Sequence, residues 1–111
     1  HVAEGPASNI FIIKNGIMYT PGDGILRGIT RQVFIDLAKT INMEVNLCNI
    51  STFDLFTADE IFTTSTAGGA LPIKEVSGRK VKDSVPGTIT KKLDSLYWRL
   101  RESGEGSTLI N

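Results

Sequence analysis

Two glycine-containing segments of the 111-residue chain combine backbone N–H groups with hydroxyl side chains, which is chemistry that binds anions. The first segment, Leu26–Arg31, leads into a predicted helix, whose first turn has free N–H groups and about +0.5 of an elementary charge. In it, Gly28 lets a ligand approach the backbone and Thr30 adds a hydroxyl donor. The second segment, Ser65–Gly69, follows a predicted strand and can turn its N–H groups toward one point. If the two segments converge, they can bind a phosphate without any lysine.

Each of these features also has an ordinary structural interpretation. A glycine loop before a helix is often only a turn, and Thr30 is a common type of helix N-cap. Threonines suit strands, so the hydroxyls near Thr66 need not bind anything. The only histidine is His1, so no Ser/His/Asp triad can be assembled. The lone Cys48 can build neither an internal disulfide nor a multi-cysteine metal site, and we predict no metal site.

Charge and composition exclude several classes of protein. Twelve Lys and Arg balance twelve Asp and Glu, so the net charge is zero and the pI is about 6.8. This balance argues against an electrostatic nucleic-acid binder and against a polybasic membrane-surface protein. No apolar run approaches the roughly 20 residues that cross a bilayer. We predict one domain over residues 1–111 with a flexible tail over 105–111, and the lone cysteine favours a reducing, cytoplasmic compartment.

The first half of the chain predicts strands and a helix that position the first anion segment. The apolar run Ile10–Ile13 is typical of a strand buried on both faces, and Asn15-Gly16 predicts a type I′ hairpin turn after it. A helix is predicted from about Thr30 to a stop at Asn42. Its predicted buried stripe is Ile29, Val33, Phe34, Leu37 and Ile41.

The second half predicts the strand that carries the second anion segment. Residues 43–48 alternate as a half-buried strand, and Ser51 with Asp54 resembles a capping box that opens a short helix. Residues 60–64 predict a strand that runs directly into Ser65–Gly69. A final helix follows Gly87 and has a buried stripe. Strands and helices alternate in a mixed pattern, so the predicted class is α/β or mixed α+β, with helices packed on a mixed sheet.

Four motifs in order resemble the class IV (fold type IV) pyridoxal-phosphate aminotransferases. The family includes branched-chain and D-amino-acid aminotransferases and R-selective amine transaminases. The motifs lie at residues 3–11, 26–31, 58–73 and 87–90. Within the family, the Ala-Glu-Gly opening at 3–5 and the Thr-Ala-Gly-Gly stretch at 66–69 look most like the R-selective branch.

The resemblance implies pyridoxal 5′-phosphate as cofactor and assigns roles to individual residues. Glu4 would face the pyridine nitrogen and keep the ring protonated, and Leu26 would pack on the ring. Gly28, Ile29 and Thr30 would hold one side of the phosphate. Ser65 and Thr66 would hold the other side, and Thr66 with Ala67 would contact the substrate. The implied substrates are an amino acid or amine and a keto acid.

The resemblance also implies what the chain lacks. In this family the Schiff-base lysine and the small N-terminal domain lie upstream of the Glu motif, which here is at Glu4. The chain is therefore expected to be the C-terminal part of the large domain, with no catalytic residue of its own and at most weak cofactor affinity. Two alternatives remain open: a non-catalytic module that binds a phosphometabolite, and a fragment that complements a missing N-terminal portion. Because a separated domain exposes strand faces such as Ile10–Ile13, a homodimer or larger assembly is expected.

Overall fold

The apolar run near the start of the chain forms the central strand of a sheet. In the computed structural model, which describes residues 10–22, 29–81 and 87–103, β1 (Ile10–Lys14) pairs antiparallel with β2 (Ile17–Thr20). Asn15 and Gly16 connect these strands with φ angles of 54° and 80°. Both angles lie in the left-handed region that a type I′ turn requires, so the predicted hairpin is confirmed.

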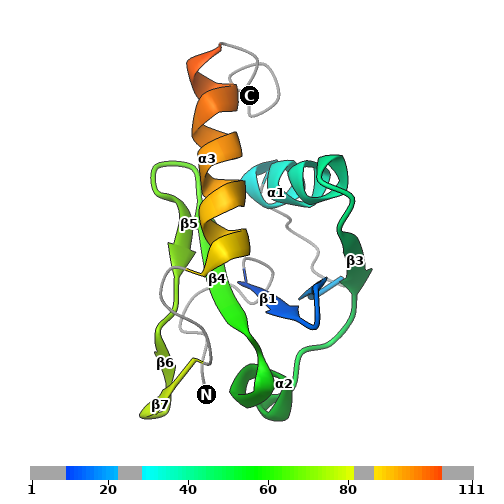
Figure 1. The fold of residues 1–111 in the computed structure, drawn as a ribbon, viewed down its shortest axis with the longest axis vertical. Helices are drawn as coiled ribbons and strands as arrows, with labels where there is room; N and C mark the ends of the chain where they lie inside the picture. Colours follow the sequence, from blue (N-terminus) through cyan, green and yellow to red (C-terminus); the bar gives the residue numbers. More distant parts are fainter. Residues whose placement is uncertain (1–9, 23–28, 82–86, 104–111) are drawn as a thin grey trace.

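Three further strands complete a mixed sheet. They are β3 (Glu44–Leu47), β4 (Glu60–Ser65) and β5 (Gly69–Pro72), and the strand order is β3-β2-β1-β4-β5. The pair of β2 and β3 is parallel and the other pairs are antiparallel, which confirms the predicted mixed sheet. The short strands β6 (Glu75–Val76) and β7 (Arg79–Lys80) form a separate two-stranded ribbon (Figure 1).

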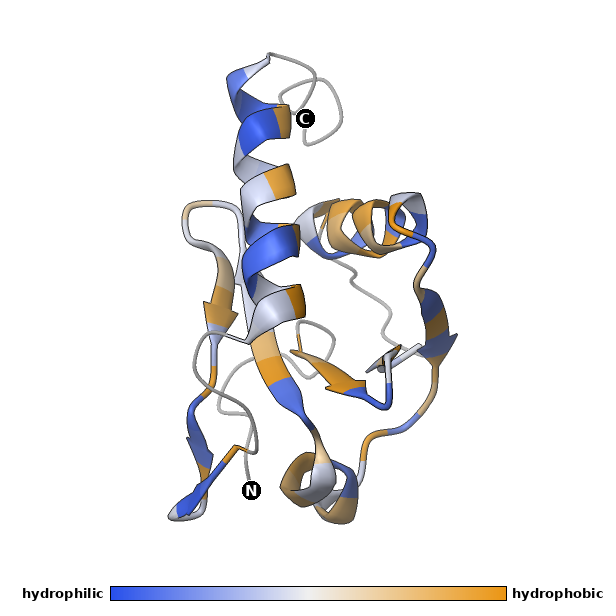
Figure 2. Cartoon of the chain, viewed as in Figure 1, coloured by the Kyte–Doolittle hydropathy of each residue, from blue (hydrophilic) through white to orange (hydrophobic). Residues whose placement is uncertain are grey.

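Helices cover both faces of the sheet. The longer helices α1 (Ile29–Thr40) and α3 (Thr88–Glu102) pack on one face, and the short helix α2 (Thr52–Thr57) packs on the other (Figure 1). The apolar positions of α3 lie on the side toward α1, and its charged positions lie away from it (Figure 2). In the described part of the chain, no helix is long and apolar enough to span a bilayer.

The central strand belongs to two cores at once. Phe11 and Ile13 point into a larger core with α1 and α3, whereas Ile10 and Ile12 point into a smaller core with Leu55 of α2. All four residues of Ile10–Ile13 are 0–5% exposed. The strand is therefore buried on both faces, as predicted, but the expectation that this run is an exposed association surface was wrong. Alternate side chains of a strand point to opposite faces, and here each face is covered.

The predicted buried stripe of α1 was partly wrong. Ile29 is 48% exposed, whereas Ile35 is 4% exposed and Arg31, expected to lie outside the stripe, is 1% exposed. The reason is that α1 contacts β3, β4 and α3, so its buried sector is wider than a single stripe. Asn42 ends the helix region with φ of 63°, as predicted.

Side-chain hydrogen bonds, one set local and one long-range, fix the other predicted helix starts. Ser51 and Asp54 form the predicted capping box: the Asp54 N–H donates to Ser51 Oγ at 3.1 Å, and the Ser51 N–H donates to Asp54 Oδ2 at 2.8 Å. The first turn of α3 is capped instead by Glu60 of β4, which is buried. Its carboxylate accepts the Ile89 N–H at 3.1 Å and the Thr90 N–H at 2.7 Å. Charge-assisted hydrogen bonds thus connect the first residue of β4 to the N-terminus of α3.

Candidate anion-binding site

The described part of the first anion segment, residues 29–31, forms the start of α1, which is hydrogen-bonded to the end of the hairpin. The buried Arg31 guanidinium donates to the Pro21 carbonyl, just after β2. Thr30 is in the first turn of α1 and is 5% exposed, and that turn contains no acidic residue. The positive end of the α1 dipole therefore lies beside the Thr30 hydroxyl, with no carboxylate in the first turn itself.

The second anion segment is the tight connection between β4 and β5. The Gly68 N–H donates to Ser65 Oγ at 2.8 Å, and Gly69 has φ of 71°, in the left-handed region. The Ala70 N–H donates to Asp94 of α3 at 2.9 Å. These bonds give the loop a defined shape and leave Thr66 and Ala67 exposed at its tip.

The structure brings the two segments together. Thr30 Oγ1 lies 2.7 Å from Thr66 Oγ1, a hydrogen bond in which either hydroxyl can donate. These residues are 36 positions apart in sequence and reach each other because α1 and α3 pack on the same face of the sheet. The two segments, which the sequence could only suggest to be neighbours, therefore contact each other in the fold through these two residues.

The other predicted site residues are distributed unevenly around this contact. Ala67 follows Thr66 directly and is exposed, and Ile29 precedes Thr30 with an exposed side chain. Ser65 uses its hydroxyl within its own loop. The remaining predicted site residues, Glu4, Leu26 and Gly28, lie outside the described residues, as does the predicted tail over 105–111.

Sequence reasoning missed the residues of α3 that support the second loop. Tyr97 donates its hydroxyl to the Thr66 carbonyl at 2.9 Å, and Arg101 Nη1 donates to the same oxygen at 2.5 Å. Asp94 accepts from the Ala70 N–H and from the Trp98 indole N–H at 3.0 Å. The spacing of residues 94, 97, 98 and 101 places them on one side of a helix, but it does not link them to the loop.

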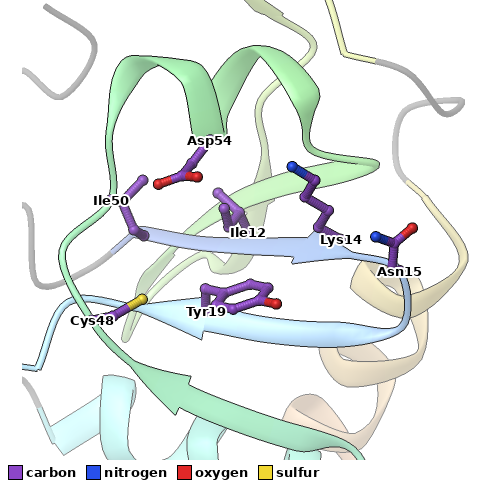
Figure 3. A pocket seen from close by; sticks show the side chains of 7 residues that line it. All are labelled: Ile12, Lys14, Asn15, Tyr19, Cys48, Ile50 and Asp54. Atoms are coloured by element: carbon purple, nitrogen blue, oxygen red, sulfur yellow. The ribbon is translucent and has the colours of Figure 1, made fainter.

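A pocket of about 350 Å³ lies on the other face of the sheet, beneath α2 (Figure 3). Its lining side chains come from β1, β2, the turn between them, the segment between β3 and α2, and α2 itself. They are Ile12, Lys14, Asn15, Tyr19, Cys48, Ile50 and Asp54. Lys14 Nζ donates to Thr57 at 2.8 Å, and Cys48 follows β3 and is exposed. The pocket is thus separated by the sheet from the contact between Thr30 and Thr66.

The sequence matches the model of the family described as amino-transferase class IV over residues 1–76. This match covers more than half of the chain and includes both anion segments. The chain belongs to the class IV aminotransferase family.

Relatives of this class IV aminotransferase chain agree with the assignment. A putative branched-chain-amino-acid aminotransferase of Methanocaldococcus jannaschii is 45% identical over 102 residues, which cover 90% of this chain and 35% of the relative. A solved branched-chain aminotransferase from Thermoproteus uzoniensis, with norvaline, is 35% identical with a TM-score of 0.76, over 92% of this chain and 34% of that one. A solved aminotransferase from Brucella abortus, bound to the cofactor PLP, is 34% identical with a TM-score of 0.75, over 84% and 33%.

These matches confirm the fold and extend over only part of each relative. The mixed sheet and its helices correspond to one segment of the solved class IV aminotransferases. The chain spans about a third of the length of the relatives it matches. Two of these relatives are named as branched-chain enzymes, whereas the Ala-Glu-Gly and Thr-Ala-Gly-Gly stretches predicted the R-selective branch.

Proposed function

We propose that this chain provides the phosphate-binding half of the cofactor site in a class IV aminotransferase. The proposed reaction is amino-group transfer between a branched-chain amino acid and a keto acid, with pyridoxal 5′-phosphate as cofactor. The observation that carries the proposal is the 2.7 Å contact between the Thr30 and Thr66 hydroxyls, which joins the two segments that the family resemblance assigns to the phosphate. The family match does not favour a stand-alone phosphometabolite-binding module.

The residues at this contact fit a phosphate group. Each hydroxyl has one proton, and one of the two is used in the contact between Thr30 and Thr66; both can donate to phosphate oxygens once an anion replaces that contact. The first turn of α1 would add backbone N–H groups and the positive end of the helix dipole. No acidic side chain lies in that turn to repel an anion. This donor set suits a dianionic group on a neutral chain, since it needs no lysine.

The chain's own residues would bind and orient the cofactor. When bound, pyridoxal phosphate withdraws electrons from the substrate Cα and so allows exchange of the amino group. Thr30 and Thr66 would fix the phosphate and thereby the position of the ring, with Ser65 and Gly28 in supporting loop positions. Glu4, placed by the resemblance at the pyridine nitrogen, would hold its proton, and Leu26 would cover the ring.

The branched-chain substrate class rests on the relatives rather than on the geometry. A branched-chain enzyme from Pseudomonas aeruginosa is 42% identical over 90% of this chain. Thr66 and Ala67 are exposed beside the contact between the Thr30 and Thr66 hydroxyls, where a substrate carboxylate could be bound by the loop.

We propose a homodimer or larger assembly in the cytoplasm. Ultracentrifugation tests the assembly, and a monomer at micromolar concentration would contradict it.

Titration with two probes tests the site. Inorganic phosphate and pyridoxal 5′-phosphate are added to the ¹⁵N-labelled chain, and binding is followed by the amide signals of Thr30 and Thr66. Thr30→Val and Thr66→Val remove one hydroxyl each and keep the shape, so affinity should fall about ten- to hundredfold, the effect of a hydrogen bond to a charged group. The control Thr63→Val removes a half-buried hydroxyl of β4, the strand that precedes Thr66, and should bind as the wild type does. Equal affinity of all variants would contradict the proposed site.

A further inference from the structure

Two side chains of α3 donate hydrogen bonds to one backbone carbonyl of the second anion segment. The Thr66 carbonyl oxygen accepts from Tyr97 Oη at 2.9 Å and from Arg101 Nη1 at 2.5 Å, and Arg101 Nη1 also lies 3.3 Å from Tyr97 Oη. Tyr97 is fully buried and stacks on Phe34 of α1. The Arg101 guanidinium lies over the Tyr97 ring at 5.8 Å. Of the two donors, Tyr97 is therefore fixed by the core, whereas the exposed Arg101 lies over the Tyr97 ring.

The geometry of the peptide bond transmits this constraint to the other side of the loop. In a planar trans peptide, the carbonyl oxygen and the following N–H point in opposite directions. Because the Thr66 carbonyl points to α3, the Ala67 N–H points away from it, at the exposed tip of the loop. The next N–H groups are engaged within the protein: Gly68 donates to Ser65 Oγ and Ala70 donates to Asp94.

We infer that Tyr97 and Arg101 are positioning residues that present the Ala67 N–H to an oxyanion of the ligand. The inference rests on the proposed function of this loop. The two α3 residues act through the peptide: they fix its orientation, and their hydrogen bonds to the carbonyl polarise it, so its N–H becomes a stronger donor. A loop without them keeps the Thr66 hydroxyl and the bonds of Gly68 and Ala70, but the Thr66 carbonyl loses both donors that fix its direction.

The test compares two variants with a matched control. Tyr97→Phe removes only the hydroxyl and keeps the ring in the core, and Arg101→Met removes the guanidinium and keeps the stem. Arg99→Met removes the same charge two residues away, where the side chain is exposed. The first readout is the ¹⁵N shift of the Ala67 amide, which responds to hydrogen bonds at the preceding carbonyl. We expect it to move in both variants and not in the control, while core amides such as that of Met18 stay in place.

The second readout is the affinity for two probes, inorganic phosphate and 4-methylvalerate, which separate a phosphate from a carboxylate ligand. We expect affinity for at least one probe to fall about three- to tenfold in both variants, the effect of one hydrogen bond. An unmoved Ala67 amide overturns the inference. Wild-type binding that the variants retain in full also overturns it but leaves the proposed function intact. Absence of binding in every form, the wild type included, contradicts the proposed function and the inference together.

Discussion

Glu60 and Gly87 form a contact in which a buried carboxylate needs a residue without a side chain beside it. The Glu60 carboxylate accepts three donors of the first turn of α3: two backbone N–H groups and the Thr90 hydroxyl at 2.8 Å. Gly87 is the N-cap of α3 and has no capping side chain, and a Cβ at this position would overlap the Glu60 carboxyl group. The strand residue thus replaces the usual cap.

Substitution of either partner should destabilise the chain. Gly87→Ala forces the carboxylate from its donors, and Glu60→Gln places an amide N–H₂ against backbone N–H groups. We expect each to lower the free energy of unfolding by about 1–3 kcal/mol. Urea denaturation measures this, with the exposed Glu75→Gln as control. Unchanged midpoints for both variants would show that the cap contributes nothing.

Substitutions at two glycines with positive φ distinguish the cost of backbone strain from the cost of steric overlap. Gly69 and Gly78 have φ of 71° and 82°, but a Cβ at Gly69 would overlap Asp94 and Trp98, whereas a Cβ at Gly78 meets nothing within 4 Å. We expect Gly78→Ala to cost about 1–2 kcal/mol, the strain of the left-handed region alone. Gly69→Ala should cost about 1–3 kcal/mol more. Equal losses in urea unfolding would contradict the overlap.

At the residue scale, the sequence predicted which hydroxyl and glycine residues could bind an anion, but not which distant residues contact them. Thr30 and Thr66 could be named because hydroxyls beside glycines are local chemistry. Asp94 and Tyr97 could not be linked to the loop, since they lie 24 and 31 positions from the groups they bind. Contacts of this kind depend on how α3 lies on the sheet, which local patterns do not encode.

At the scale of elements, α1 shows the same division between local pattern and packing. Its extent was predictable from periodicity, but the width of its buried sector depends on three neighbours. We expect Ile35→Ala, in the larger core, to lower the free energy of unfolding by about 2–5 kcal/mol. Ile29→Ala, at a 48% exposed position, should stay within about 0.5 kcal/mol. Denaturant unfolding measures both losses, and a larger loss for Ile29→Ala than for Ile35→Ala would contradict the wider buried sector.

Elements with strong local signals were predicted most accurately. The Asn15-Gly16 turn and the capping box that opens α2 are fixed by side chains within a few residues, so sequence alone suffices. In α2, by contrast, an aromatic residue does not imply burial, since Phe53 is 68% exposed. The helix has six residues and buries only Leu55, so it offers too little surface to cover its other apolar side chains.

At the scale of the whole molecule, the chain spans about a third of the length of its relatives. We expect the 111-residue chain alone to catalyse no measurable transamination, because the family resemblance places the Schiff-base lysine in a region that this chain does not match. Borohydride reduction with pyridoxal phosphate, followed by intact mass measurement, checks this. A stoichiometric lysine adduct together with turnover would contradict the expectation.

The class of the fold was predictable, but its strand order was not. Alternating strand and helix patterns predict a mixed sheet, and four short motifs in sequence order predict the family. The placement of β1 between β2 and β4, and of β3 parallel to β2, depends on pairings across many residues. Such pairings are chosen by the burial of both faces of β1, a property of the assembled molecule.

The central position of β1 has a consequence for the newly made chain. Its hairpin with β2 is local and can form within microseconds, but its other edge stays open until β4, which follows α1, β3 and α2 along the chain, pairs with it. During that interval Ile10–Ile13 is an uncharged, β-prone segment with an open edge, which favours aggregation over refolding. The strand at the centre of the folded sheet is therefore open to pairing with another chain until β4 covers its second edge.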